Sequence, residues 1–134
     1  VRKHELKRFL EAQNVPYVED EYDHHEWLSV IKGLEDEPER GSRCSVCFQF
    51  RLSHAAKYAQ EHGFHLLTTT LASSRWKNIR QIDTAGHLAV EAYPDVEWWD
   101  MNWRKGGLQN RRGELLRINE FYNQLYCGCE FSMR

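Results

Sequence analysis

Helical patterns alternate along this chain with short apolar stretches that are typical of strands. Helices are expected over residues 1–14, 24–35, 45–62, 73–93 and 108–122, and strands over 15–18, 64–72 and 96–103, with a final loop or strand at 125–132. Helices that alternate with strands favour a parallel sheet covered by helices on both faces. We therefore predict an α/β protein with a three-layer, Rossmann-like architecture.

Individual residues mark where several of these helices end or begin. Asn14 is expected to stop the first helix, and Gly63 to cap the helix that contains residues 45–62. Ser73 or Ser74 is the expected N-cap of the next helix, which Pro94 terminates. In open parallel sheets, ligands bind at the carboxyl ends of strands. The polar turn after residues 64–72 is therefore a candidate ligand site.

The length and composition restrict the class of protein. A chain of 134 residues, 41% of them hydrophobic, is long enough for one domain with a core, and we predict a single domain over residues 1–134. The sequence contains no run of 18 apolar residues, which a membrane-spanning helix would need, and no signal-peptide pattern. We therefore expect a cytoplasmic protein. The chain starts at Val1 inside a helical pattern, from which we expect that an N-terminal segment precedes it.

The net charge of −2 gives no global attraction to nucleic acid. Locally, however, five cations between positions 104 and 117 face a single anion, Glu114. A local patch of this kind can bind phosphates even when the total charge is slightly negative. A solvated basic helix is the other reading of the same residues.

The first cysteine pair is a Cys-x-x-Cys at the start of the helix predicted over residues 45–62. Cys44 and Cys47 lie where the helix dipole and unpaired backbone N–H groups favour a thiolate, and Arg43 and Arg51 add positive charge. In a reducing compartment such pairs serve metal binding or catalysis more often than structural disulfides. The motif alone is shared by zinc ribbons, thiol–disulfide oxidoreductases and iron–sulfur proteins.

The second pair has a different spacing, Cys127-Gly128-Cys129. Two cysteines one residue apart can close a small, strained disulfide ring, and a strained disulfide is easily reduced. This spacing indicates a catalytic or regulatory couple. Two alternatives remain open: one structural zinc site built from all four cysteines, and a general thiol–disulfide oxidoreductase.

Several ordered motifs together resemble the epoxyqueuosine reductases of the QueH type. They are YDHHEWLSVIKGLEDEPERGSRCSVCFQFRL from position 22, TTTLASSRWKN from 68, WRKGG from 103 and FYNQLYCGCEFS from 121. The resemblance runs from about residue 22 to the end of the chain. It implies an α/β sheet related to adenine-nucleotide hydrolase-like folds, with the first strand missing here.

The resemblance also implies an activity and its cofactors. Members of this family reduce the epoxide of epoxyqueuosine in tRNA to queuosine, the last step of queuosine synthesis, with a [4Fe-4S] cluster and an additional iron ion. Cys44 and Cys47 match two ligands of the cluster, and Cys127 and Cys129 match a C-x-C pair that cycles as a redox disulfide. The electron donor is not implied by any motif.

The chain departs from the family pattern at three places. No cysteine precedes Cys44, so the family's N-terminal Cys-Cys pair, which supplies the other two cluster ligands, is absent. Leu108 stands where a serine is expected after the double glycine, and Ser74-Arg75 replaces a Ser-Pro of some members. We therefore interpret the chain as an N-terminally truncated member with half of the cluster ligands.

A tRNA substrate requires cations for phosphates and aromatic rings for unstacked bases. The candidate phosphate contacts are Arg75, Lys77, Arg80, Arg104 and Lys105. The candidate stacking residues are Trp76 and Trp103, and a role in the core is the other interpretation of each. These residues lie at the expected carboxyl ends of the strands, and we expect the anticodon loop to bind there.

Overall fold

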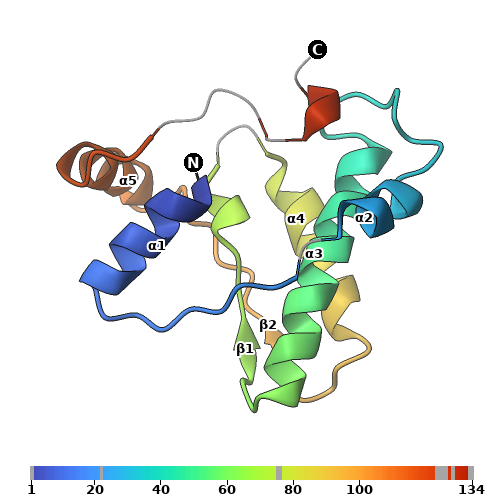
Figure 1. Cartoon of the computed structure of the whole chain (residues 1–134), viewed down its shortest axis with the longest axis horizontal. Coiled ribbons are helices and arrows are strands. Elements are labelled where there is room, and N and C mark those ends of the chain that lie inside the picture. The colour runs from blue at the N-terminus through green and yellow to red at the C-terminus, as the bar shows by residue number, and fades with distance from the viewer. Residues whose placement is uncertain (1, 22, 75–76, 123–126, 128, 133–134) are drawn as a thin grey trace. The chain divides into compact units, whose positions relative to one another are not determined.

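The computed structural model describes residues 2–21, 23–74, 77–122, 127 and 129–132. They fall into two compact units, one formed by residues 24–105 and the other by residues 1–23 together with 106–134. Each unit is described by itself, and Figure 1 gives the labels of the helices and strands. Among the described residues, no helix combines the length and the apolar character that crossing a membrane requires.

The unit of residues 24–105 contains a small parallel sheet and three α-helices. Its elements in order are α2 (His24–Val30), α3 (Ser42–Glu61), β1 (Leu66–Leu67), the 3-10 helix η1 (Thr70–Ser73), α4 (Ile79–Val90) and β2 (Glu97–Trp98). The two strands run parallel, with Leu66 opposite Glu97 and Leu67 opposite Trp98 (Figure 1). Because α4 lies between the strands in sequence, this is the crossover connection that parallel strands require.

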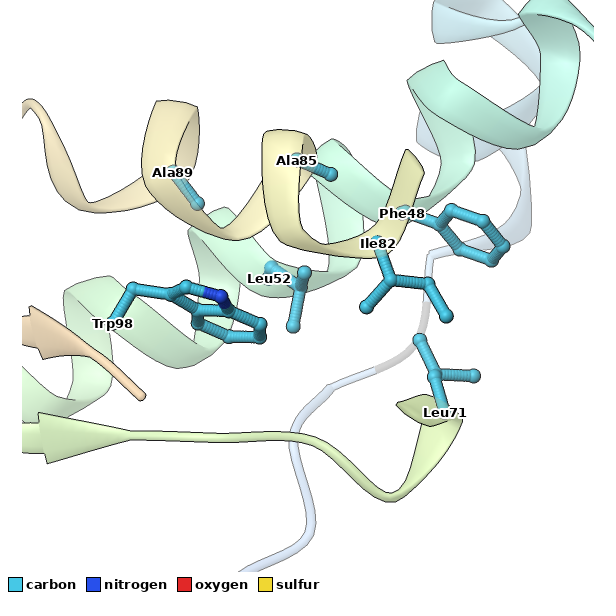
Figure 2. Packing of buried hydrophobic residues seen from close by; sticks show 7 residues of the cluster. All are labelled: Phe48, Leu52, Leu71, Ile82, Ala85, Ala89 and Trp98. Atoms are coloured by element: carbon cyan, nitrogen blue, oxygen red, sulfur yellow. The ribbon is translucent and has the colours of Figure 1, made fainter. Parts of the chain in front are cut away.

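The core of this unit forms where α3 and α4 pack together over the sheet. Its buried members come from α3, η1, α4 and β2: Phe48, Leu52, Leu71, Ile82, Ala85, Ala89 and Trp98 (Figure 2). Gly86 of α4 lies directly against the indole of Trp98, since a Cβ atom at this glycine would stand 2.2 Å from a ring carbon. A residue without a side chain is therefore needed for α4 to approach β2.

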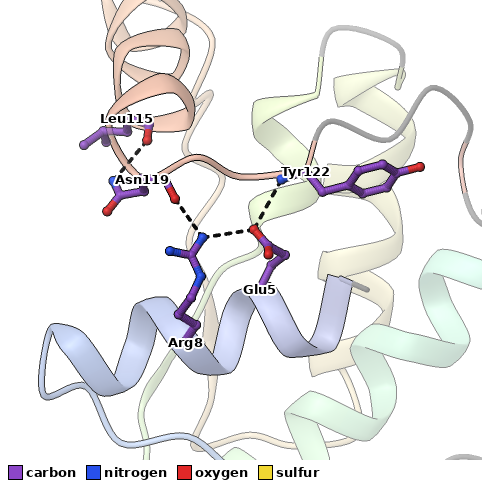
Figure 3. A network of polar contacts seen from close by, with 5 residues as sticks. All are labelled: Glu5, Arg8, Leu115, Asn119 and Tyr122. Carbon is purple, nitrogen blue, oxygen red and sulfur yellow. Dashed lines mark hydrogen bonds and ion pairs between the residues drawn. The ribbon is translucent and has the colours of Figure 1, made fainter.

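The second unit contains α1 (Arg2–Ala12), α5 (Leu108–Ile118) and the 3-10 helix η2 (Glu130–Ser132). Figure 3 shows how α1 binds the segment after α5. Arg8 donates to the Asn119 carbonyl at 2.7 Å and to Glu5 at 3.1 Å, and the Tyr122 amide donates to Glu5 at 3.2 Å. The hydrogen bond from Arg8, followed by that from the Tyr122 amide, lowers the pKa of Glu5 below its ordinary value.

The α/β class and the parallel strands predicted from the sequence are confirmed. Both predicted helix stops are also correct. Asn14 adopts a left-handed φ of 57°, and the Val15 amide donates to the Leu10 carbonyl at 2.9 Å. Gly63, with φ of 75°, ends α3 in the same way. The three-layer architecture and the single-domain organisation stay predictions.

Three expectations about secondary structure are wrong. The strand predicted over residues 64–72 is limited to Leu66–Leu67, and its last residues lie in η1. Residues 15–18 form no strand: Val15 and Val18 are exposed, and among the described residues no strand pairs with them. The helix predicted from position 73 begins only at Ile79. Its N-cap is Asn78, whose side-chain oxygen accepts hydrogen bonds from the amides of the second and third helical residues at 3.0 and 3.3 Å.

Candidate functional site

Cys44 and Cys47 lie in the first two turns of α3. The helix begins at Ser42 behind the N-cap Gly41, slightly earlier than the sequence pattern predicts. Both cysteines are partly buried, and Cys44 packs against the core cluster of Figure 2. A spacing of three residues places the two side chains on one face of the helix.

Each of the two sulfur atoms accepts a hydrogen bond from a nitrogen donor. The indole Nε1 of the buried Trp27, in α2, lies 3.4 Å from the Sγ atom of Cys47. The backbone amide of Arg40 lies 3.3 Å from the Sγ atom of Cys44. Hydrogen bonds to sulfur are one of the means by which iron–sulfur sites are tuned. The Sγ atoms of Cys44 and Cys47 therefore each have an N–H donor directed at them.

Arg43 supports the loop that leads into α3. It is only 2% exposed, and its Nη1 donates to the carbonyls of Glu35 at 3.2 Å and Glu37 at 2.5 Å. From the sequence, the charge of Arg43 is expected to lie beside the cysteines. In the structure, its Nη1 atom donates to carbonyls of the preceding loop. This buried cation therefore holds the loop that leads into α3.

The residues present fit part of an iron–sulfur site. A [4Fe-4S] cluster takes four cysteine ligands, and the hydrogen-bonded thiols of Cys44 and Cys47 suit two of those places. Among the described residues, no group of three or more His, Cys, Asp or Glu side chains is placed to hold a metal ion. Cys44 and Cys47 are therefore a candidate pair of cluster ligands and not a complete metal site within the described residues.

Cys127 and Cys129 belong to the unit that contains α1 and α5. Their backbone carbonyls are held in place: Arg2 donates to that of Cys127 at 2.9 Å, and the Ser132 hydroxyl to that of Cys129 at 2.7 Å. All four cysteines of the chain carry thiols rather than disulfides, and Gly128 lies outside the described residues. Because the two pairs belong to different units, their convergence on one site stays a prediction.

The predicted phosphate contacts have different surroundings. Nη1 of Arg104 donates to the carbonyls of Ser74 at 3.3 Å and Lys77 at 3.2 Å, so this cation fixes the segment after η1. The ammonium of Lys77 lies 5.4 Å from the centre of the Phe48 ring. Arg80 and Lys105 are exposed to solvent. Two further candidates, Arg75 and Trp76, lie outside the described residues.

Trp103 packs edge-on against Trp99, with ring centres 5.1 Å apart and an angle of 79° between the planes. Trp99 is 42% exposed and follows β2 directly, and its carbonyl accepts a hydrogen bond from Thr68 beyond the end of β1. Trp99 is not among the stacking residues expected from the sequence. The alternation of buried Val96 and Trp98 with exposed residues signals that Trp99 faces outward.

Trp27 is the other residue that sequence reasoning missed. Its position in an amphipathic helical pattern indicates only a core residue, and nothing in the pattern places its indole N–H against a cysteine. Twenty residues separate it from Cys47 in the sequence.

The family model and the curated relatives that match this chain carry the same description. A family model described as epoxyqueuosine reductase QueH matches residues 1–134. Curated relatives carry the same name: one from Histophilus somni is 48% identical over 134 residues, and one from Acinetobacter baylyi is 46% identical over 134 residues. Each alignment covers 100% of this chain but only 55% and 62% of the relative, so the chain spans about half the length of the curated relatives it matches.

Proposed function

The chain belongs to the epoxyqueuosine reductase QueH family, and from this we propose that it carries part of the catalytic machinery that reduces epoxyqueuosine in tRNA to queuosine. The observation that carries the proposal is the match along residues 1–134, which includes both cysteine motifs. A substrate in tRNA agrees with the cytoplasmic location expected from the sequence.

The reaction defines what the cysteines must supply. Removing an epoxide oxygen as water and leaving a carbon–carbon double bond requires two electrons and two protons. The thiols of Cys127 and Cys129 together hold both: when they close to a disulfide, they release two electrons and two protons, and the balance is one epoxide and two thiols giving one alkene, one water and one disulfide. A reductant that is not yet identified then regenerates the thiols.

Cys44 and Cys47 are proposed as two ligands of the [4Fe-4S] cluster. When bound, such a cluster supplies a store of electrons at a potential that depends on burial and on hydrogen bonds to sulfur. In this chain, Trp27 and the Arg40 amide provide those hydrogen bonds. The remaining ligands and the additional iron ion need residues other than those described, and the N-terminal Cys-Cys pair of the family is our candidate for them.

We also propose that β1 and β2 are part of a larger parallel sheet of the Rossmann-like, adenine-nucleotide hydrolase-like type. Two strands of two residues each make a sheet too small to be stable alone. Leu66 of β1 is exposed in this structure, as expected for a strand that can take a further neighbour. A first strand from the family's N-terminal region is the proposed neighbour.

The anticodon loop is proposed to bind near the carboxyl ends of β1 and β2. Trp99 and Trp103 provide aromatic surface for an unstacked base, and the exposed Arg80 and Lys105 provide charge for phosphates. Arg75 and Trp76 are proposed from the sequence alone. Arg104 contributes by fixing the segment of Lys77.

Expression in bacteria tests the proposed activity. A strain without its own epoxyqueuosine reductase accumulates epoxyqueuosine in tRNA, and the protein that contains this chain is expressed there. Mass spectrometry of nucleosides from the digested tRNA should show a species with one oxygen atom fewer. If epoxyqueuosine persists although the protein is soluble and holds an iron–sulfur chromophore, the proposal is wrong. A colourless protein with bound zinc supports the structural zinc module instead.

A further inference from the structure

We propose that Trp27 and Gln81 are positioning residues that adapt the Cys44–Cys47 pair to a soft, thiophilic metal. The proposal rests on the function proposed above only in naming an iron–sulfur cluster as the natural occupant. Its evidence is local to the unit of residues 24–105: one N–H donor is directed at each sulfur, and a buried amide holds the loop that carries one of those donors.

Trp27 acts on Cys47 directly. An indole N–H can only donate a hydrogen bond, and a buried donor needs an acceptor. In this structure the sulfur of Cys47, at 3.4 Å, is an acceptor for it. A side chain from α2 therefore fixes both the position and the electron density of a sulfur in α3.

Gln81 acts on Cys44 through the backbone. From α4, its Nε2 atom lies within hydrogen-bond distance of three acceptors, the carbonyls of Arg40 and Gly41, each at 3.0 Å, and the Ser45 hydroxyl at 2.6 Å, which share its two N–H groups. Two of these three neighbours are carbonyls, which only accept, so the nitrogen rather than the oxygen of the amide must face them. The side chain of Gln81 thus connects α4 to Arg40 and Gly41, where the chain bends before α3.

The bend itself needs that support. Arg40 adopts a left-handed φ of 70°, which is unfavourable for a residue with a side chain and persists only when its surroundings hold it. In this conformation its amide points at the sulfur of Cys44. Gly41 follows so closely on Pro38 that an added Cβ atom would lie 2.9 Å from the Pro38 carbonyl oxygen. The chain is therefore tightly turned at Arg40 and Gly41, and Gln81 holds the carbonyl groups of both residues.

Cadmium binding tests this inference without reference to enzyme activity. The polypeptide of residues 1–134 carries Cys127→Ser and Cys129→Ser, so that Cys44 and Cys47 are its remaining cysteines and alone give the sulfur-to-cadmium absorption band. In this background Trp27→Phe keeps an aromatic ring but removes the donor. Since partners of metal ligands typically contribute 10- to 100-fold to affinity, we expect the Kd for cadmium to rise by about 10-fold or more. The absorption band should also move to longer wavelength, because the sulfur lone pairs lose a hydrogen bond.

Two further variants separate this role from a general effect on folding. Gln81→Met, which keeps the length of the side chain and removes its donors, should also weaken cadmium binding by about 10-fold. Tyr58→Phe also removes one hydrogen-bond donor from an aromatic side chain, at an exposed position of the same unit, and should leave the Kd and the band unchanged. Thermal unfolding confirms that each variant is folded.

The outcomes distinguish this inference from the proposed function. If the parent protein gives the sulfur-to-cadmium band and Trp27→Phe and Gln81→Met bind cadmium as tightly, the inference is wrong while the proposed reductase activity is unaffected. If cadmium binding weakens as expected but epoxyqueuosine is never reduced, the positioning roles stand and the proposed function fails. A parent protein without the band contradicts the inference, because the pair is then no metal site.

Discussion

Replacing Gly86 by alanine should destabilise the unit of residues 24–105, although alanine is the better helix former. A Cβ atom at this position would lie 2.2, 2.3 and 2.6 Å from three carbon atoms of the Trp98 ring. Trp98 is buried and its indole N–H donates to Asp83 at 3.2 Å, so the ring has little freedom to move away. Figure 2 shows this indole beneath α4, among the other core side chains.

The expected magnitude follows from two opposing terms. The higher helix propensity of alanine stabilises by about 1 kcal/mol, whereas forcing a methyl group into a well-packed core typically costs about 1–3 kcal/mol and occasionally more. Because the contacts with the Trp98 ring are so short, we expect a packing cost at the upper end of that range, about 2–3 kcal/mol. After the gain in helix propensity is subtracted, the free energy of unfolding falls by about 1–2 kcal/mol. For a unit of this size, each kcal/mol lowers the unfolding temperature by about 4–8 °C.

Gly113→Ala is the matched control for this prediction. Gly113 also lies inside a helix, α5, but an added Cβ atom would meet no heavy atom within 4 Å. This variant should therefore be stabilised by about 0.5–1 kcal/mol. Thermal unfolding, followed by far-UV circular dichroism and tryptophan fluorescence, compares the two variants with the parent protein. An unchanged or raised unfolding temperature for Gly86→Ala would refute the reasoning about α4 and β2.

Three further predictions concern pH, RNA binding and redox chemistry. The pKa of Glu5 in the folded protein is lowered from the ordinary value of 4.5, so ionised Glu5 stabilises its unit above about that pH, and this contribution is lost as the pH falls through the lowered pKa. Glu5→Gln should therefore reduce the loss of stability at acidic pH in a curve of unfolding free energy against pH. An unchanged loss contradicts the network of Figure 3. Trp99→Ala should weaken binding of an anticodon stem-loop by about 1–3 kcal/mol in fluorescence titrations. Phe64→Ala, which removes an even more exposed aromatic ring of the same unit (57% against 42%), should not weaken it. Equal effects of the two changes remove Trp99 from the interface. In a single turnover without added reductant, mass spectrometry should find one disulfide per queuosine formed, and Cys129→Ser should form neither; queuosine without a disulfide rules out the thiols as the electron source.

The sequence predicts those parts of the fold that depend on local periodicity and on turn residues. The helices, the two parallel strands and the stops at Asn14 and Gly63 are set by hydrophobic spacing and by left-handed turn positions, which are visible in the residues themselves. The segment 15–18 has the residue types of a strand, but a strand also needs a partner, which no local pattern reveals. Asn78 replaced the predicted serine caps because its side chain alone reaches two free amides of the first turn.

The sequence predicts the cysteines of the candidate site but not the side chains that form hydrogen bonds around them. The motif spacing predicts Cys44 and Cys47 as metal ligands, and the structure places them in the first two turns of α3, while the ligand role stays a prediction. The hydrogen bond of Trp27 and the contacts of the Gln81 amide with three acceptors arise from the packing of α2 and α4 on α3, and such contacts have no local sequence signature. The buried position of Arg43 likewise depends on a loop whose course cannot be read from its composition.

The most direct measurement of the central claim is the conversion of tRNA that carries epoxyqueuosine by the purified protein that contains this chain, alongside its Cys44→Ser and Cys47→Ser variants. Nucleosides from the digested tRNA are weighed by mass spectrometry, and tRNA binding is measured in parallel. The account predicts loss of one oxygen atom from the modified base with the parent protein, and no conversion by either variant despite unchanged tRNA binding. Conversion by both variants at the parent rate would contradict it, because the sulfur pair at the start of α3 would then have no part in the reaction.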